Sequence, residues 1–335
     1  MKEITVCPCR LTEGFFTYSP TGLKRLFNGR RVKHIMRYRH KSDTFQDEQQ
    51  SNIKRISLSG VQEKYSAIVE KGELILTPDG VQGRYIIKPI PADKGIRYRH
   101  GLPANEHLTM QIAHQIFKID TAECGLIFHI DGYPAYITKR FDFAEDGSKF
   151  NQEDFASLIG KSKQLNGSDF KYQGSYEDIA IEIKRRVAAY PVELEKFFNQ
   201  VVFNYIFGNN DAHLKNFSLM QTPDGDYKLT PAYDMLNATI HVEDSDFALI
   251  GGLSTNMDYS DSYDRKGHPI REDFETFGRL IGLNDKQIRK TISRYIGADI
   301  PSKVEKLIAL SFLDDKLKRI YLHSYEERMS RFNRV

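Results

Sequence analysis

The segment FGNNDAHLKNFSLM, residues 207–220, gathers amide, carboxylate, imidazole and ammonium groups between two apolar flanks. Residues 191–206, which precede it, carry apolar side chains at a 3.6-residue period, and this predicts a buried helix. The apolar positions are Leu194, Phe197, Phe198, Val201, Val202, Tyr205 and Ile206. Pro191 suits the first helical turn and Gly208 suits the end. A polar loop at the end of a buried helix is a usual position for functional residues.

The two halves of the chain differ in character. Short β-type runs, GELILTPDG and GRYIIKP, and the hairpin signal LIFHIDGYPAYITKRFD dominate the first half. Between them, residues 105–117 predict a helix capped by Asn105. Helical patterns dominate after about residue 150, with one further hairpin over residues 216–234. The fold class expected is therefore α+β, with a mixed β/α N-terminal part (1–145) and a mostly α-helical C-terminal part (146–335).

The composition fits a cytoplasmic protein of two lobes. The chain has 335 residues, 40% of them hydrophobic, and a net charge of +3. No apolar run reaches the roughly 20 residues of a membrane helix. The N-terminal MKEITVCPCR lacks the apolar region of a signal peptide. The lack of a long apolar run predicts no membrane insertion. Three cysteines cannot form a disulfide framework, so we expect reduced thiols.

One run of positive charge stands out from this balanced composition. Residues 24–41, KRLFNGRRVKHIMRYRHK, contain eight Lys or Arg, two His and no acidic residue. The run is either a solvated face packed over Leu26, Val32, Ile35 and Met36, or a docking patch for phosphates or an acidic partner. The sequence leaves both interpretations open.

The polar loop has the spacing of a phosphoryl-transfer site. Asp211 and Asn216 are separated by four residues, as in the kinase catalytic loop, where Asp accepts the substrate hydroxyl proton and Asn holds a magnesium ion. His213 and Lys215 alternate with them, and either could face the γ-phosphate of a nucleotide.

Three further segments occur in the order that this chemistry requires. Asp234, in TPAYDML, is placed to be a second metal ligand after the hairpin. Lys88, in YIIKP, follows a β-type run and could hold the α- and β-phosphates. Upstream, ISLSGVQEKYS (residues 56–66) is a candidate loop over the phosphates. Each signal is weak alone, but their order is much more specific.

With these motifs in place, the chain resembles the HipA-type serine/threonine kinases of bacterial toxin–antitoxin modules. The resemblance runs from Ile56 to at least Asn237 and is carried by SLSGVQEKYS, YIIKP, NEH, TKRFD, GNNDAHLKNFSL and LTPAYD. It implies a bilobal protein-kinase-like fold that uses ATP and Mg2+. By this resemblance Asp211 is the catalytic base, and Asn216 and Asp234 bind magnesium.

The same resemblance implies a set of nucleotide contacts. Lys88 holds the ATP phosphates, and Glu106 orients Lys88. Ser59 and Gly60 belong to the phosphate loop. The segment beside the adenine, between the lobes, is Lys139, Arg140, Phe141 and Asp142.

The chain departs from the longer family members at its N-terminus, since the phosphate-loop region begins only some fifty residues in. This resembles the shortened HipT toxins of three-gene HipBST modules. It implies a small partner protein that supplies the missing N-terminal subdomain and covers apolar surface left by its absence. It also implies a DNA-binding antitoxin, with DNA contacted indirectly through the antitoxin complex.

Ser57 and Ser59 are the expected autophosphorylation sites, because the family modifies a serine in this loop and a phosphoserine beside ATP would repel the nucleotide. The implied substrate is an aminoacyl-tRNA synthetase, whose phosphorylation inhibits translation and growth. The chain has no Trp despite 18 Tyr and 21 Phe, which favours the tryptophanyl enzyme over the glutamyl one.

Two other functions remain open on the sequence. A metal-dependent phosphoesterase or nucleotidyltransferase could be built on Asp211, His213 and Asp234, although it would leave Lys88 and the serine loop unexplained. A non-catalytic DNA-bound repressor-complex component could use the basic run for phosphates and carry a vestigial kinase site. ATP turnover separates the second alternative from a kinase.

Overall fold

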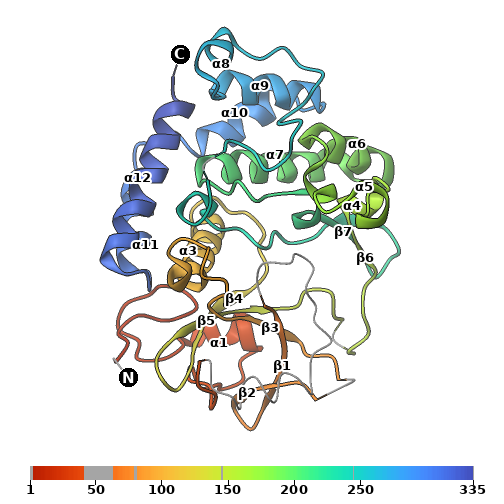
Figure 1. Ribbon diagram of the computed structural model, residues 1–335. Helices are drawn as coiled ribbons and strands as arrows, with labels where there is room; N and C mark the ends of the chain where they lie inside the picture. Colours follow the sequence, from red (N-terminus) through yellow and green to blue (C-terminus); the bar gives the residue numbers. More distant parts are fainter. Residues whose placement is uncertain (1–2, 41–62, 79–80, 145, 244, 335) are drawn as a thin grey trace. The chain divides into compact units, whose positions relative to one another are not determined.

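The computed structural model describes residues 3–40, 63–78, 81–144, 146–243 and 245–334 (Figure 1). The chain divides into two compact units. Unit 1 comprises Met1–Gln111, Ala122–Phe141 and Glu305–Lys318, and unit 2 comprises Ile112–Thr121, Asp142–Val304 and Arg319–Val335. Each unit is therefore assembled from three separate segments of the chain. The described residues contain no helix long and apolar enough to span a membrane.

Unit 1 is built on a five-stranded antiparallel sheet of order β2-β1-β3-β5-β4 (Figure 1). The strands are β1 (Tyr65–Glu70), β2 (Glu73–Leu76), β3 (Tyr85–Lys88), β4 (Cys124–Phe128) and β5 (Pro134–Lys139). The predicted β4–β5 hairpin is confirmed. A two-residue turn joins β1 to β2. Both of its residues, Lys71 and Gly72, have positive φ, as a type I′ turn requires.

The N-terminal segment packs onto this sheet. Helix α1 (Pro20–Phe27) begins at the N-cap Ser19 and ends at Asn28 in the left-handed conformation. Its Leu26 and Phe27 belong to one apolar cluster with sheet residues such as Ile87.

A short 3-10 helix, η1 (Arg99–Gly101), precedes α3 (Leu102–Gln115). Helix α3 belongs to unit 1 up to Gln111 and to unit 2 from Ile112. The prediction that Asn105 caps this helix was wrong. Pro103 occupies the first turn, and Asn105 is fully buried inside the helix, where its side chain accepts a hydrogen bond from Thr109.

Unit 2 is mostly helical. Its elements before the polar loop are β6 (Gln152–Asp154), α4 (Phe155–Leu158), α5 (Lys163–Asn166), η2 (Phe170–Tyr172), α6 (Tyr176–Arg186) and α7 (Tyr190–Ile206). After it come η3 (Leu214–Asn216), β7 (Ser218–Gln221), β8 (Tyr227–Leu229), η4 (Ala238–Ile240), α8 (Asp261–Lys266), α9 (Arg271–Leu280) and α10 (Asp285–Ser293). Strands β6, β7 and β8 form a small sheet in that order. Helices α11 (Ile300–Leu310) and α12 (Asp315–Phe332) each contribute residues to both units.

Helix α7 is the core of unit 2. All seven predicted apolar positions are buried, and so are polar residues on its other sides, Asn199, Gln200 and Asn204. Stacked aromatic pairs surround its C-terminal end. Ring centroids lie 4.4 Å apart for Phe203–Phe207, 5.1 Å for Phe207–Tyr325 and 4.5 Å for Phe117–Tyr295. The helix is therefore enclosed by the core along most of its length.

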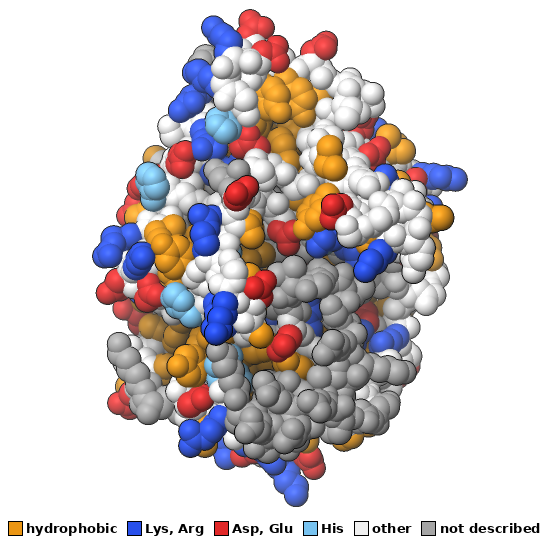
Figure 2. Space-filling model, in the orientation of Figure 1, with side chains coloured by type: hydrophobic (Ala, Val, Ile, Leu, Met, Phe, Trp, Pro, Cys, Tyr) orange, Lys and Arg blue, Asp and Glu red, His pale blue; other side chains and the backbone are white. Residues whose placement is uncertain are grey.

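The surface shows no segregation of charge on the face drawn in Figure 2. Basic and acidic side chains are interspersed there among apolar and neutral ones. This mixture matches the small net charge of the chain.

Gly208 follows α7 and Gly267 follows α8, and the two differ in how closely their neighbours pack. Gly208 and Gly267 both follow a helix with positive φ, +63° and +70°. A Cβ at Gly208 would lie 2.8 Å from Oδ1 of Asn237, whereas a Cβ at Gly267 would meet nothing within 4 Å.

Gly267→Ala should lower the free energy of unfolding by about 1 kcal/mol through backbone strain alone. Gly208→Ala should cost about 1–3 kcal/mol more because its neighbours must move. Urea unfolding of both variants measures this difference, and equal losses would contradict the close packing around Gly208.

Candidate active site

The polar loop is held in place by its own backbone and by two buried apolar side chains. The positive φ of Gly208 turns the chain away from the axis of α7. The Asn209 N–H still donates to the Asn204 carbonyl at 2.8 Å. Ala212 and Leu214 are buried at 1% and 0% exposure. Because they alternate with Asp211, His213 and Lys215, their burial fixes the polar side chains of the loop.

Asp211 is half-buried and hydrogen-bonded. Its Oδ1 accepts from the Tyr172 hydroxyl at 2.8 Å. The Tyr172 ring lies edge-on against the His213 ring, with centroids 5.3 Å apart. Burial, and then the charge of Asp211, raise the pKa of Tyr172, so its hydroxyl stays protonated and remains a donor.

Lys215 forms an ion pair within unit 2. Its Nζ lies 2.7 Å from Oδ2 of Asp154 and above the Phe170 ring at 5.8 Å. Both charged side chains are mostly buried. This pair gives Lys215 a structural role, and the contact of Lys215 or His213 with a γ-phosphate stays a prediction.

Asn216, like Asn209 and Asn210 in the same loop, has a buried amide oxygen that could accept a further contact. The residue is buried, and its Oδ1 has no hydrogen-bond partner in the described part of the chain. A buried amide oxygen left unpaired is costly, and a cation would satisfy it.

Tyr233, the residue before Asp234, is hydrogen-bonded to the polar loop. The Tyr233 hydroxyl donates to the Lys215 carbonyl at 2.9 Å and lies 2.6 Å from Ser218 Oγ. The residue before Asp234 therefore contacts the residue before Asn216. Asp234 itself has a φ of 56°, an uncommon conformation for a residue other than glycine. Such local strain is often found at functional sites.

The donor set suits Mg2+ bound to a nucleotide. No group of three or more His, Cys, Asp and Glu side chains among the described residues is placed to hold a metal ion. Mg2+ does not require one, because it commonly takes one or two carboxylates and completes its shell with water and substrate phosphates. Asn216 and Asp234 fit that pattern.

In unit 1, Lys88 and Glu106 form a buried ion pair. Lys88 Nζ lies 2.6 Å from Glu106 Oε1, and the two side chains are only 4% and 2% exposed. Strand β3 supplies the lysine and helix α3 the glutamate. Tyr136, opposite Lys88 on β5, places its ring 5.3 Å from the ammonium. Losing one partner of such a pair leaves an uncompensated buried charge, so each residue constrains the other.

The other predicted nucleotide contacts are distributed as follows. Lys139 ends β5 and donates to Asn28 Oδ1 at 2.7 Å, and burial lowers its pKa. The Arg140 N–H donates to the Arg84 carbonyl. The chain passes from unit 1 to unit 2 between Phe141 and Asp142. The role of this segment beside adenine stays a prediction. Ser57, Ser59 and Gly60 lie outside the described residues.

Sequence reasoning missed three side chains that contact the polar loop. Tyr172 bonds to Asp211, Asp154 pairs with Lys215, and Tyr233 bonds to the Lys215 carbonyl. Tyr233 adjoins Asp234, so its position was a usable signal. Tyr172 and Asp154 lie 39 and 61 residues upstream of their partners, and no local pattern connects them.

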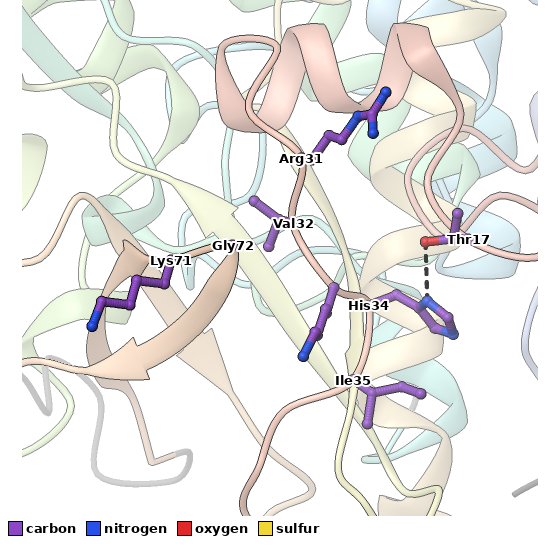
Figure 3. Close-up of a pocket in the computed structure, with 8 residues that line it drawn as sticks. Thr17, Arg31, Val32, His34, Ile35, Lys71 and Gly72 are labelled. Atoms are coloured by element: carbon purple, nitrogen blue, oxygen red, sulfur yellow. Dashed lines mark hydrogen bonds between the residues drawn. The ribbon is translucent and has the colours of Figure 1, made fainter.

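Unit 1 also contains an open pocket of about 590 Å3 in the basic run (Figure 3). It is lined by Thr17, Arg31, Val32, Lys33, His34, Ile35, Lys71 and Gly72. Arg31 and Lys71 point away from each other in Figure 3, and Lys33 pairs with Glu73 at 2.7 Å. Burial lowers the pKa of His34, which favours its neutral form. The cations thus do not converge on one anion.

Other residues of the basic run are either buried and apolar or paired with an acidic side chain. Leu26, Val32 and Met36 are buried, while Arg37 shares Glu73 with Lys33. Arg25 pairs with Glu123 at 2.6 Å. For the described part of the run, these contacts favour the interpretation as a solvated face over an apolar cluster.

Comparison with known proteins identifies the family. Residues 56–302 match the family model of the HipA-like C-terminal domain. A putative kinase of Haemophilus influenzae is 28% identical over 350 residues, covering 99% of this chain and 97% of that protein. Putative kinase Y4dM of Sinorhizobium fredii is 30% identical over 236 residues, 66% of this chain and 54% of that protein. The serine/threonine-protein kinase toxin HipA of Shewanella oneidensis is 24% identical over 297 residues, 84% of this chain and 64% of that protein.

Solved structures show the fold. HipA in the Shewanella oneidensis complex of HipA, HipB and operator DNA matches with a TM-score of 0.62 and 21% identity, over 83% of this chain and 65% of that one. The Helicobacter pylori proinflammatory kinase CtkA matches with a TM-score of 0.52 and 16% identity, over 81% and 90%. The chain thus spans nearly all of the Haemophilus protein, about half of Y4dM and about two thirds of HipA.

These matches confirm the predicted fold class, a mixed β/α part and a mostly helical part of the kind found in HipA and CtkA. The family match covers most of the chain and includes Lys88, Asp211, Asn216 and Asp234. The chain belongs to the family of the HipA-like C-terminal domain.

Proposed function

We propose that the chain is an ATP-dependent serine/threonine-protein kinase and a toxin of the HipA type. The observation that carries the proposal is the geometry of the polar loop. A half-buried, hydrogen-bonded Asp211 precedes by five positions a buried Asn216 whose Oδ1 has no partner among the described residues. Kinase catalytic loops require this pair, one residue to accept a proton and one to bind metal.

The residues would divide the reaction between them. Lys88, held by Glu106, would bind the α- and β-phosphates of ATP. Asp211 would orient the substrate hydroxyl and accept its proton, while Asn216 and Asp234 would hold Mg2+. The ion would neutralise charge that develops on the phosphates. Most of the catalysis would then be positioning and electrostatics.

Regulation would come from the serine loop. Autophosphorylation of Ser57, Ser59 or both would add nearly two negative charges per site beside the nucleotide phosphates. Lys54, Arg55 and Lys64, close in sequence, could hold the modified loop away from ATP. The family membership of residues 56–302 supports this proposal.

The proposed partners are an antitoxin, a small partner protein and a synthetase substrate, and a solved relative supports the first of them. The solved HipA structure contains HipB and operator DNA, which supports a DNA-binding antitoxin and indirect DNA contact for this chain. A small partner protein of the kind found in HipBST modules would contribute an N-terminal subdomain. Phe16, Ile130 and Tyr133 of unit 1 are 60%, 49% and 49% exposed and offer apolar surface for it. The substrate would be tryptophanyl-tRNA synthetase, otherwise the glutamyl enzyme.

Asp211→Asn should remove the proton acceptor while keeping the shape of the side chain. Phosphate transfer from Mg-ATP, read by intact mass with each synthetase present, should fall about 100- to 10,000-fold. Asp226→Asn is the matched control, since Asp226 is exposed in the turn between β7 and β8. Full transfer by Asp211→Asn would refute the assigned base. ATP left untouched by the unaltered chain would favour the non-catalytic DNA-bound alternative.

Lys88→Met separates the structural and catalytic roles of the buried pair. The single variant should lose phosphate transfer and about 3–5 kcal/mol of unfolding free energy, because Glu106 stays buried without its cation. Lys88→Met with Glu106→Leu should regain most of that stability and remain inactive. Urea unfolding and intact mass of both variants test this expectation. Transfer restored in the double variant would contradict a role for Lys88 in phosphate binding.

A further inference from the structure

Tyr172 occupies a position that the family motifs do not include. It lies at the end of η2, 39 residues before Asp211, and its hydroxyl donates to Asp211 Oδ1 at 2.8 Å. A hydrogen bond from a phenol to a carboxylate is among the stronger kinds, because the acceptor is ionised. The contact therefore restricts the rotation of the carboxylate that the proposed reaction uses.

The surroundings of η2 make this contact specific. Phe170, Lys171 and Tyr172 form the turn, and two of them touch the polar loop. Phe170 lies beneath the Lys215 ammonium, and the Tyr172 ring packs against the His213 ring. The turn thus contacts each of the three polar side chains that alternate along residues 211–215.

The turn is itself anchored from a second direction. The Ile250 N–H donates to the Tyr172 carbonyl at 3.0 Å, and the Gly251 N–H donates to the Gly174 carbonyl at 2.9 Å. A Cβ at Gly251 would lie 2.9 Å from the Gly174 carbonyl oxygen, so the two segments approach too closely for a side chain there. The backbone around Tyr172 is therefore held by Ile250 and Gly251 in addition to the hydroxyl bond to Asp211.

Resting on the proposed kinase function, we propose that Tyr172 is a positioning residue that holds the Asp211 carboxylate in the orientation needed to accept the substrate proton. In that reaction the substrate serine or threonine oxygen bonds to the γ-phosphorus of ATP. The bond between that phosphorus and the β–γ bridging oxygen breaks, ADP leaves, and the hydroxyl proton passes to Asp211. Tyr172 keeps its own proton throughout and acts only through Asp211.

Tyr172→Phe tests the proposal because it removes the hydroxyl and keeps the ring against His213. The acceptor is whichever protein gains phosphate from the unaltered chain: the chain itself, or tryptophanyl- or glutamyl-tRNA synthetase. The maximal transfer rate should fall about 10- to 100-fold. The ATP concentration for half-maximal rate should stay within about twofold, since Tyr172 acts on positioning and not on nucleotide binding.

Two comparisons separate positioning from general loop stability. Tyr176→Phe removes a hydroxyl that donates to the Ala212 carbonyl at 3.0 Å, in the same loop but at a backbone atom. It should lower the unfolding midpoint and change the maximal rate by less than about threefold. In an Asp211→Asn background, Tyr172→Phe should have no further effect on the rate, because both changes act on one carboxylate.

The outcomes distinguish this inference from the function on which it rests. Equal maximal rates for Tyr172→Phe and the unaltered chain would overturn the positioning role and leave the kinase intact. An equal fall in the maximal transfer rate of Tyr172→Phe and Tyr176→Phe would also overturn the positioning role, because it would show that both hydroxyls act through the stability of the loop. No phosphate on any acceptor with the unaltered chain would overturn the kinase proposal, and the positioning role with it.

Discussion

The enclosure of helix α7 is the constraint on which the rest of unit 2 depends. The helix is buried on its polar as well as its apolar sides, and aromatic pairs stack around its C-terminal end. A close-packed interior has low compressibility, so the C-terminal end of this helix is held in one position. Gly208 then turns the chain sharply, and the buried Ala212 and Leu214 leave the alternating side chains of the loop little freedom. A rigid support of this kind suits chemistry that depends on position.

A second constraint acts in unit 1, where two opposite charges are buried together. Removing Lys88 and Glu106 from water is costly, and their mutual attraction offsets that cost only while both are present. An apolar pair of similar size would regain most of the stability that is lost when one partner is removed. A buried ion pair is weak evidence of a purely stabilising role, and this one is compatible with the phosphate-binding role proposed for Lys88.

The sequence leaves two interpretations of the basic run open, and the contacts of the folded chain favour one of them. Most of its apolar residues belong to one cluster with residues of the sheet. Three of its cations pair with acids contributed by β2 and by the segment before β4. Charge that is dense along the sequence is thus partly neutralised in space. For the described residues, this part of the molecule stabilises unit 1, and nothing in its geometry requires an anionic ligand.

Periodicity and turn chemistry in the sequence determined the course of α7, the stop at Gly208, the hairpins β4–β5 and β7–β8, and the fold class. They did so because these features depend on residues close together in the chain. The start of α3 was misjudged at Asn105, since burial overrode a local capping preference. Only the tertiary structure decided that Glu106 pairs with Lys88, that Lys215 pairs with Asp154, and that Tyr172 donates to Asp211. These contacts join residues 18 to 61 positions apart on different elements, and their geometry is set by packing, which no local pattern encodes.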